Sequence, residues 1–112
     1  MDVLPLLKGT LDVLVLKALA WAPMHGFELT RWIADRSGAA FDLDEAAVYQ
    51  SLYRLEARRC VAAEWGISEK GRRARYYRLT AAGRAQLRRE ETAWRRYAAV
   101  VTGILDAAPE RA

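Results

Sequence analysis

The sequence is poor in the residue types that build metal centres, disulfides and most catalytic sites. Its 112 residues include one cysteine, Cys60, and one histidine, His25. A single cysteine excludes an intramolecular disulfide, and one cysteine with one histidine cannot assemble a Cys/His zinc site within one chain. The sequence also shows no glycine-rich phosphate loop and no constellation of nucleophile and base. We therefore expect no enzyme, no metal site and no cofactor.

Long apolar runs are missing too. Runs such as Val13–Leu16 are far shorter than the roughly 20 residues of a membrane-spanning helix, and no charged leader precedes a signal-like segment. We expect a cytoplasmic protein with no membrane partner. At 112 residues the chain is long enough for one compact domain with an appendage. Its 53% hydrophobic and 29% charged residues indicate a packed fold.

What the sequence has is a concentrated excess of positive charge. Eighteen Lys and Arg against fourteen Asp and Glu leave a net charge of +4, and the pI is near 9.6. Five of the nine residues Lys70–Arg78 are basic and none is acidic. They surround a turn centred on Gly71, and such a focused charge suits a polyanionic partner.

Apolar spacing predicts three helices ahead of this turn. Asp44 is a candidate cap for the third of them, because its side chain can accept from free amides of the first turn. Val48, Leu52 and Leu55, spaced by four and three, would form the buried stripe of that helix. The helices are expected at residues 10–21, about 25–36 and 44–58.

Residues 61–67 and 74–79 are rich in aromatic and β-branched side chains and can alternate with period two around a polar turn at 68–73. They predict a β-hairpin. Thr80 is then a candidate cap for a helix that reaches about Leu105, roughly 37 Å long at 1.5 Å per residue.

That last helix is longer than a domain of this size needs for itself. Leu87, Trp94 and Val101 recur every seven residues, which indicates helix-on-helix pairing and predicts a dimerisation arm. The element order predicts an α+β, mostly helical fold. It is a winged helix-turn-helix, with three helices plus a two-stranded β-hairpin wing, followed by a C-terminal dimerisation helix. We expect a DNA-binding domain at residues 1–79 and the dimerisation helix with a short tail at 80–112.

Four stretches of the sequence together span nearly the whole chain. They are Leu-Lys-Gly-Thr-Leu-Asp at 7–12, Met-His-Gly-Phe-Glu-Leu at 24–29, Val-Tyr-Gln-Ser-Leu-Tyr-Arg-Leu-Glu at 48–56 and Arg-Arg-Ala-Arg-Tyr-Tyr-Arg-Leu-Thr at 72–80. In these stretches and in their order the chain resembles the PadR family of bacterial transcriptional regulators.

The resemblance implies a homodimer that binds a palindromic operator in double-stranded DNA. Such a protein is usually a repressor, and a small aromatic or drug-like molecule often releases it from DNA. Short members of the family have one C-terminal helix that packs with the first helix across the dimer, and this chain has room for that version. A constitutive or architectural DNA-binding protein without an effector remains the alternative.

The chain departs from the family pattern at the start of the third helix. The family commonly has Gly-Ser before Leu-Tyr-Pro, whereas this chain has Ala46-Ala47 before Val48-Tyr49-Gln50. A hydroxyl that donates to phosphate or a base edge is lost, and Gln50 adds an amide able to pair with adenine. The operator sequence is therefore expected to differ from those of other members.

The residues expected at the DNA surface belong to the third helix and the wing. The alternative for the helix is a solvated face, and for the wing an ordinary solvated turn. Arg75 and Arg78, further down the strand, are equally compatible with pairing to glutamates. The candidate DNA-binding residues are Ala47, Tyr49, Gln50, Tyr53, Arg54, Lys70, Arg72, Arg73 and Arg75.

Trp94 has two open interpretations, the wall of an effector pore at the dimer centre or the large residue of a packed seam. His25 is expected to be structural, with its imidazole bonded across the first turn of a helix. Cys60 is expected to be a small buried hydrophobe, with a thiol switch as the alternative. The candidate effector residues are Leu14, Lys17, Trp94 and Ala98, and the candidate dimerisation residues are Leu11, Val15, Leu87, Trp94, Val101 and Leu105.

Overall fold

A computed structural model describes residues 4, 6–7 and 9–110. Lys8 of the first family-like stretch and both outer limits of the expected domains lie outside the described residues. The elements follow the predicted order with one short strand added between the first two helices, and each predicted boundary is within one residue of the observed one. They are α1 (Thr10–Trp21), β1 (Met24–His25), α2 (Gly26–Arg36), α3 (Glu45–Ala57), β2 (Val61–Ile67), β3 (Arg73–Leu79) and α4 (Ala81–Leu105).

Side-chain caps explain where three of the helices begin. Asp44 accepts from the Ala46 amide at 3.0 Å, as its position predicted. Thr80 accepts from the Gly83 amide at 3.0 Å. The His25 Nδ1 accepts from the Glu28 amide while the Glu28 carboxylate accepts from the His25 amide, each at 3.2 Å. This reciprocal capping box confirms the structural role expected for His25.

The predicted hairpin belongs to a three-stranded antiparallel sheet in the order β1-β3-β2. β2 and β3 pair from Val61 with Leu79 to Ile67 with Arg73. The third strand, β1, was not predicted, because two residues are too few to show an alternating pattern. It pairs Met24 with Tyr77 on the other edge of β3, so the start of α2 is tied to the base of the hairpin.

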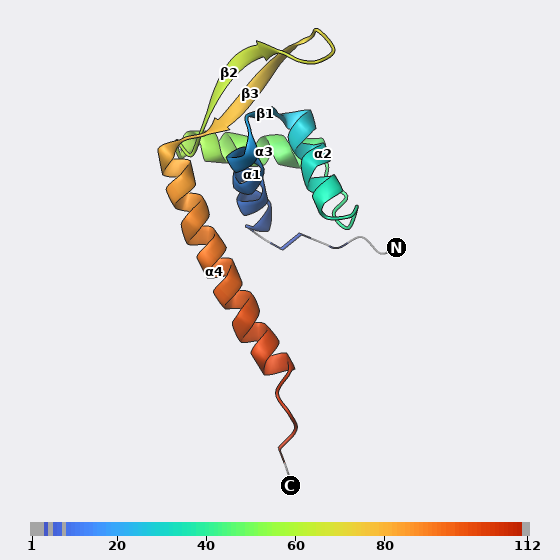
Figure 1. Ribbon diagram of the computed structural model, residues 1–112, viewed down its shortest axis with the longest axis vertical. Coiled ribbons are helices and arrows are strands. Elements are labelled where there is room, and N and C mark those ends of the chain that lie inside the picture. Colours follow the sequence, from blue (N-terminus) through green and yellow to red (C-terminus); the bar gives the residue numbers. More distant parts are fainter. Residues whose placement is uncertain (1–3, 5, 8, 111–112) are drawn as a thin grey trace.

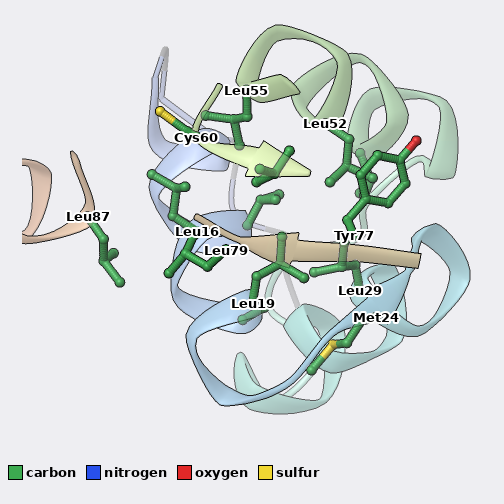
Figure 2. Packing of buried hydrophobic residues seen from close by; sticks show 14 of the residues in the cluster. Leu16, Leu19, Met24, Leu29, Leu52, Leu55, Cys60, Tyr77, Leu79 and Leu87 are labelled. Atoms are coloured by element: carbon green, nitrogen blue, oxygen red, sulfur yellow. The ribbon is translucent and has the colours of Figure 1, made fainter. Parts of the chain in front are cut away.

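The core lies where α1, α2 and α3 meet the base of the sheet. Figure 2 shows leucines of the three helices converging on Tyr77 and Leu79 of β3. Tyr77 is 1% exposed, and burial raises the pKa of its hydroxyl. Cys60, at 5% exposed, is part of this cluster, as the sequence predicted. The core thus fixes α3 and the hairpin relative to each other.

Helix α4 contacts the body as far as Trp94 and Tyr97, and its C-terminal part then extends beyond it. A Cβ on Gly83 would lie 2.0 Å from the Cys60 carbonyl oxygen, so only a glycine allows this approach. Figure 1 shows the hairpin at one end of the molecule and α4 running toward the other. The radius of gyration is 16.8 Å, whereas a compact domain of this length has about 13 Å. Within the described residues, no helix is both long and apolar enough to cross a membrane.

Candidate nucleic-acid interface

Helix α3 separates a buried face from an exposed polar one. Val48, Leu52 and Leu55 are at most 1% exposed and form the predicted stripe. Gln50 is exposed on the opposite side, and Tyr53 is 55% exposed. Because the buried stripe fixes the rotation of the helix, these outward residues are presented as one surface to a partner.

Tyr49 stands at the edge of that surface and is half-buried. A Cβ on Gly26 would lie 2.4 Å from the Tyr49 ring, so the glycine at the start of α2 makes the space that the ring occupies. Burial, with a smaller contribution from Glu45, raises the pKa of the Tyr49 hydroxyl. The hydroxyl therefore stays protonated and able to donate a hydrogen bond. Tyr53 follows one turn later, with 6.3 Å between the two ring centroids.

Arg54 is held by an acidic residue of α1. Its Nη2 donates to Asp12 Oδ1 at 2.8 Å, and the buried Ser51 hydroxyl donates to the same oxygen at 2.6 Å. The bond to Asp12 raises the pKa of Arg54. The Arg54 side chain is still 51% exposed, so guanidinium donors remain for a phosphate. This role of Asp12 was not predicted, because a contact between residues 12 and 54 leaves no local pattern in the sequence.

The wing tip is a tight turn with its basic side chains in solvent. Gly71 has φ +72°, which favours glycine, and its amide donates to the Ser68 carbonyl at 2.9 Å. Lys70, Arg72 and Arg73 are exposed. In the part of the chain that the structure describes, none of these three basic side chains forms a salt bridge. Their charge is therefore available to a polyanion.

Arg75 differs from these three residues. Its Nη2 donates to Glu56 of α3 at 2.8 Å, so the structure shows the pairing with a glutamate that the sequence left open. The Arg75 guanidinium also lies 5.6 Å from the centre of the Tyr77 ring. Arg75 thus braces the wing against α3, and its positive charge is partly balanced within the protomer.

One core holds the exposed face of α3 and the basic wing together. This is the arrangement of a winged helix that binds DNA. The model of the transcriptional regulator PadR-like family matches residues 15–89 of this chain. The chain belongs to this family. It is therefore a DNA-binding transcriptional regulator rather than an enzyme.

Solved structures and a curated protein resemble this PadR-like regulator over most of its length. A PadR family regulator from Eggerthella lenta is 30% identical, with a TM-score of 0.77 over 90% of this chain and 86% of that chain. A structure from Streptococcus mutans has a TM-score of 0.82 over 97% of this chain and 98% of that chain, at 21% identity, and supports the fold alone. An uncharacterized protein from Lysinibacillus sphaericus is 30% identical over 82 residues, 73% of this chain and 75% of that protein.

In this PadR-like regulator the candidate effector residues are not all brought together. Trp94 stacks with Tyr97, with 6.2 Å between ring centroids, and both line a shallow groove with Thr10, Val13 and Glu90. Among the described residues, those that line the groove do not include Leu14, Lys17 or Ala98. Lys17 instead lies 3.4 Å from Glu91 in a salt bridge between α1 and α4. Trp94 therefore faces the N-terminal half of α1.

The candidate dimerisation residues divide into buried and exposed sets. Val15 and Leu87 are 0% and 6% exposed and belong to the core of the protomer. Their side chains have almost no surface left for a partner. Both were candidates because apolar spacing does not distinguish a contact within the chain from one between chains. Leu11 is half-buried. Trp94, Val101 and Leu105 are 45%, 38% and 77% exposed.

Proposed function

We propose that this PadR-like regulator is a homodimeric repressor that binds a palindromic operator. Residues 1–79 would bind DNA and residues 80–112 would hold the dimer together. The observation that carries this proposal is that the described residues leave two surfaces of one protomer largely uncovered. One is polar and basic, on α3 and the wing, and the other is the apolar stripe of Trp94, Tyr97, Val101 and Ile104 on α4.

Each surface suits a different partner. Gln50 on α3 presents an amide that matches the N6 and N7 edge of adenine in the major groove. Lys70, Arg72 and Arg73 match phosphates, which contribute affinity and register rather than sequence preference. The stripe on α4 is exposed along one side of the helix, the arrangement of an unpaired helix–helix interface. Two-fold pairing of α4 would place two copies of α3 symmetrically, which explains why the operator should be palindromic.

Selection of binding sites from random DNA, followed by titration of the enriched site at several salt concentrations, tests this proposal. Enrichment of an inverted repeat with half-sites roughly 34 to 36 Å apart supports a two-fold dimer on one DNA face. A weak preference without a repeat favours the alternative, a constitutive or architectural DNA-binding protein. A reporter gene downstream of the selected site then shows whether binding lowers transcription, as the repressor requires.

The two DNA-contacting elements are separated by their effects on sequence preference and salt dependence. Replacing Arg72 and Arg73 with Ala should weaken binding similarly for all sequences and flatten the salt dependence, by about 0.9 in slope per lost phosphate contact. Gln50→Ala should instead relax the preference at one base position, by about 1–3 kcal/mol. Arg95→Ala, an exposed basic residue on α4, is the control. An unchanged salt slope in the wing variant removes the wing from the interface.

The proposed dimer is tested by charge on the α4 stripe. Ile104, 71% exposed, is replaced with Glu, and Ala99, exposed on the opposite side of the same helix, receives the same change as the control. Sedimentation should show a folded monomer for Ile104→Glu and a dimer for Ala99→Glu. A persistent dimer in both variants would mean that the stripe is not the interface.

Release by a small aromatic molecule is the last element of the proposal. The stacked pair of Trp94 and Tyr97, half-exposed beside Val13 and Thr10, supports it, because flat apolar rings stack well on an indole face. A panel of planar aromatic compounds should change tryptophan fluorescence and weaken operator binding. Both responses should be lost in Trp94→Leu and kept in Trp21→Leu, which removes an exposed indole elsewhere. Responses absent in the unaltered protein indicate a packed seam without an effector.

A further inference from the structure

One face of the wing carries apolar residues beyond the end of the core. Side chains of a strand alternate between the two faces of the sheet, so Trp65 and Ile67 lie on the same face as the buried Val61. Trp65 and Ile67 are 60% and 68% exposed, because this part of the hairpin extends past the helices. The Trp65 indole is the larger of the two exposed apolar groups on this face.

The partner of this indole is an arginine of the opposite strand. In the ladder Arg73 pairs with Ile67 and Arg75 pairs with Trp65, so Trp65 and Arg73 are diagonal neighbours on the same face. The Arg73 guanidinium carbon lies 4.5 Å from the centre of the Trp65 ring, well within the range of a cation–π contact. Arg75 makes a similar, longer contact of 5.6 Å with Tyr77 but is also paired with Glu56. The Arg73 side chain has no such carboxylate among the residues that the structure describes.

The contact with the indole leaves the N–H donors of Arg73 available to a further partner. A guanidinium that lies on a ring uses its face, whereas its five N–H donors point outward in its plane. The ring also restricts the rotamers of a long side chain, so less conformational entropy is lost when the arginine binds. The contact therefore orients a cation without neutralising it, unlike a salt bridge.

We propose that Trp65 is a positioning residue that holds the Arg73 guanidinium ready for a phosphate of the DNA backbone. The inference rests on the proposed contact between the wing and DNA. It adds that the indole acts through Arg73 rather than by touching the nucleic acid itself. Arg72, next in sequence, makes no recorded contact with an aromatic ring in the described part of the chain.

A double-mutant cycle on DNA affinity tests this inference in the full-length protein. Trp65→Leu should weaken binding about threefold, because a freed Arg73 side chain loses more conformational entropy when it binds DNA. In the Arg73→Gln background the same change should have no further effect. In the Arg72→Gln background it should again cost about threefold, which makes Arg72 the matched control. Trp65→Phe, which keeps a smaller ring, should recover part of the loss.

Salt dependence separates positioning from lost charge. Trp65→Leu keeps every cation, so its salt slope should match that of the unaltered protein, whereas Arg73→Gln should lower the slope by about 0.9 per phosphate contact. Equal losses from Trp65→Leu in the presence and absence of Arg73 would overturn the inference. If Arg73→Gln alone leaves affinity and slope unchanged, it is the proposed wing contact that fails. Circular dichroism spectra that match the spectrum of the unaltered protein confirm that every variant is folded in the binding assay.

Discussion

The body of the protomer and the distal half of α4 are both rich in apolar residues, yet they use them differently. In the body, leucines such as Leu16, Leu29 and Leu52 are fully buried. In the distal part of α4, Ile104 and Leu105 are 71% and 77% exposed. The same residue types thus stabilise one region from within and leave the other with a surface that suits a partner. The difference shows that the buried core ends near Leu87, and substitutions on either side of Leu87 test that boundary.

The largest expected effect comes from one substitution made in both regions. Leu52→Ala removes a buried side chain and leaves a cavity, so the free energy of unfolding should fall by about 3 to 5 kcal/mol. Leu105→Ala should change the free energy of unfolding, measured on dilute protein, by less than about 0.5 kcal/mol. Urea unfolding followed by circular dichroism measures both. Similar losses in the two variants would mean that the distal half of α4 is part of the core.

The joint between the two regions should be nearly as sensitive. Gly83→Ala forces a Cβ against the Cys60 carbonyl, so α4 must shift and the protein should lose about 3 kcal/mol. Gly103→Ala is the matched change in the distal half, where a Cβ meets nothing within 4 Å. Because alanine favours a helix over glycine by about 1 kcal/mol, this variant should be neutral or more stable. Calorimetry that gives the same sign for both variants would contradict the close packing at Gly83.

The link between α1 and α3 should have a smaller effect. Asp12→Ala removes the acceptor for both Ser51 and Arg54 and leaves a buried hydroxyl without its partner. We expect a loss of about 2 kcal/mol, as for hydrogen bonds to a charged group. Ser51→Ala, which removes one donor of the same network, should cost less. A larger loss from Ser51→Ala would show that the network is not centred on Asp12.

The helix cap at His25 should have the smallest effect of the four. His25→Ala removes the acceptor for the Glu28 amide and should cost about 1 kcal/mol. His25→Asn keeps a capping acceptor and should recover most of that loss. Thermal unfolding of the three proteins compares them directly. No recovery with Asn would indicate that His25 acts through its contact with the Tyr76 ring, 5.3 Å away between centroids.

Most of the fold and part of the candidate site were predictable from the sequence. Helix and strand limits follow from local spacing and from capping residues such as Asp44 and Thr80, which act over one turn. Three features were not predictable. They are the strand β1, the support that Asp12 gives Arg54, and the fit of Tyr49 on Gly26. Each joins residues far apart in the chain, and two-residue or single-residue contacts leave no periodic signal.

The sequence by itself determined the order of the elements, the family and the concentration of positive charge in the turn after β2. Local propensity and residue order carry this information, and neither needs a third dimension. Only the tertiary structure decided what each candidate residue contacts. It placed Leu87 inside the protomer and left Val101 partly exposed, although both belong to the same seven-residue repeat. It also paired Arg75 with Glu56 and left Arg73 stacked on Trp65, because partner and burial depend on which distant segments the fold brings together.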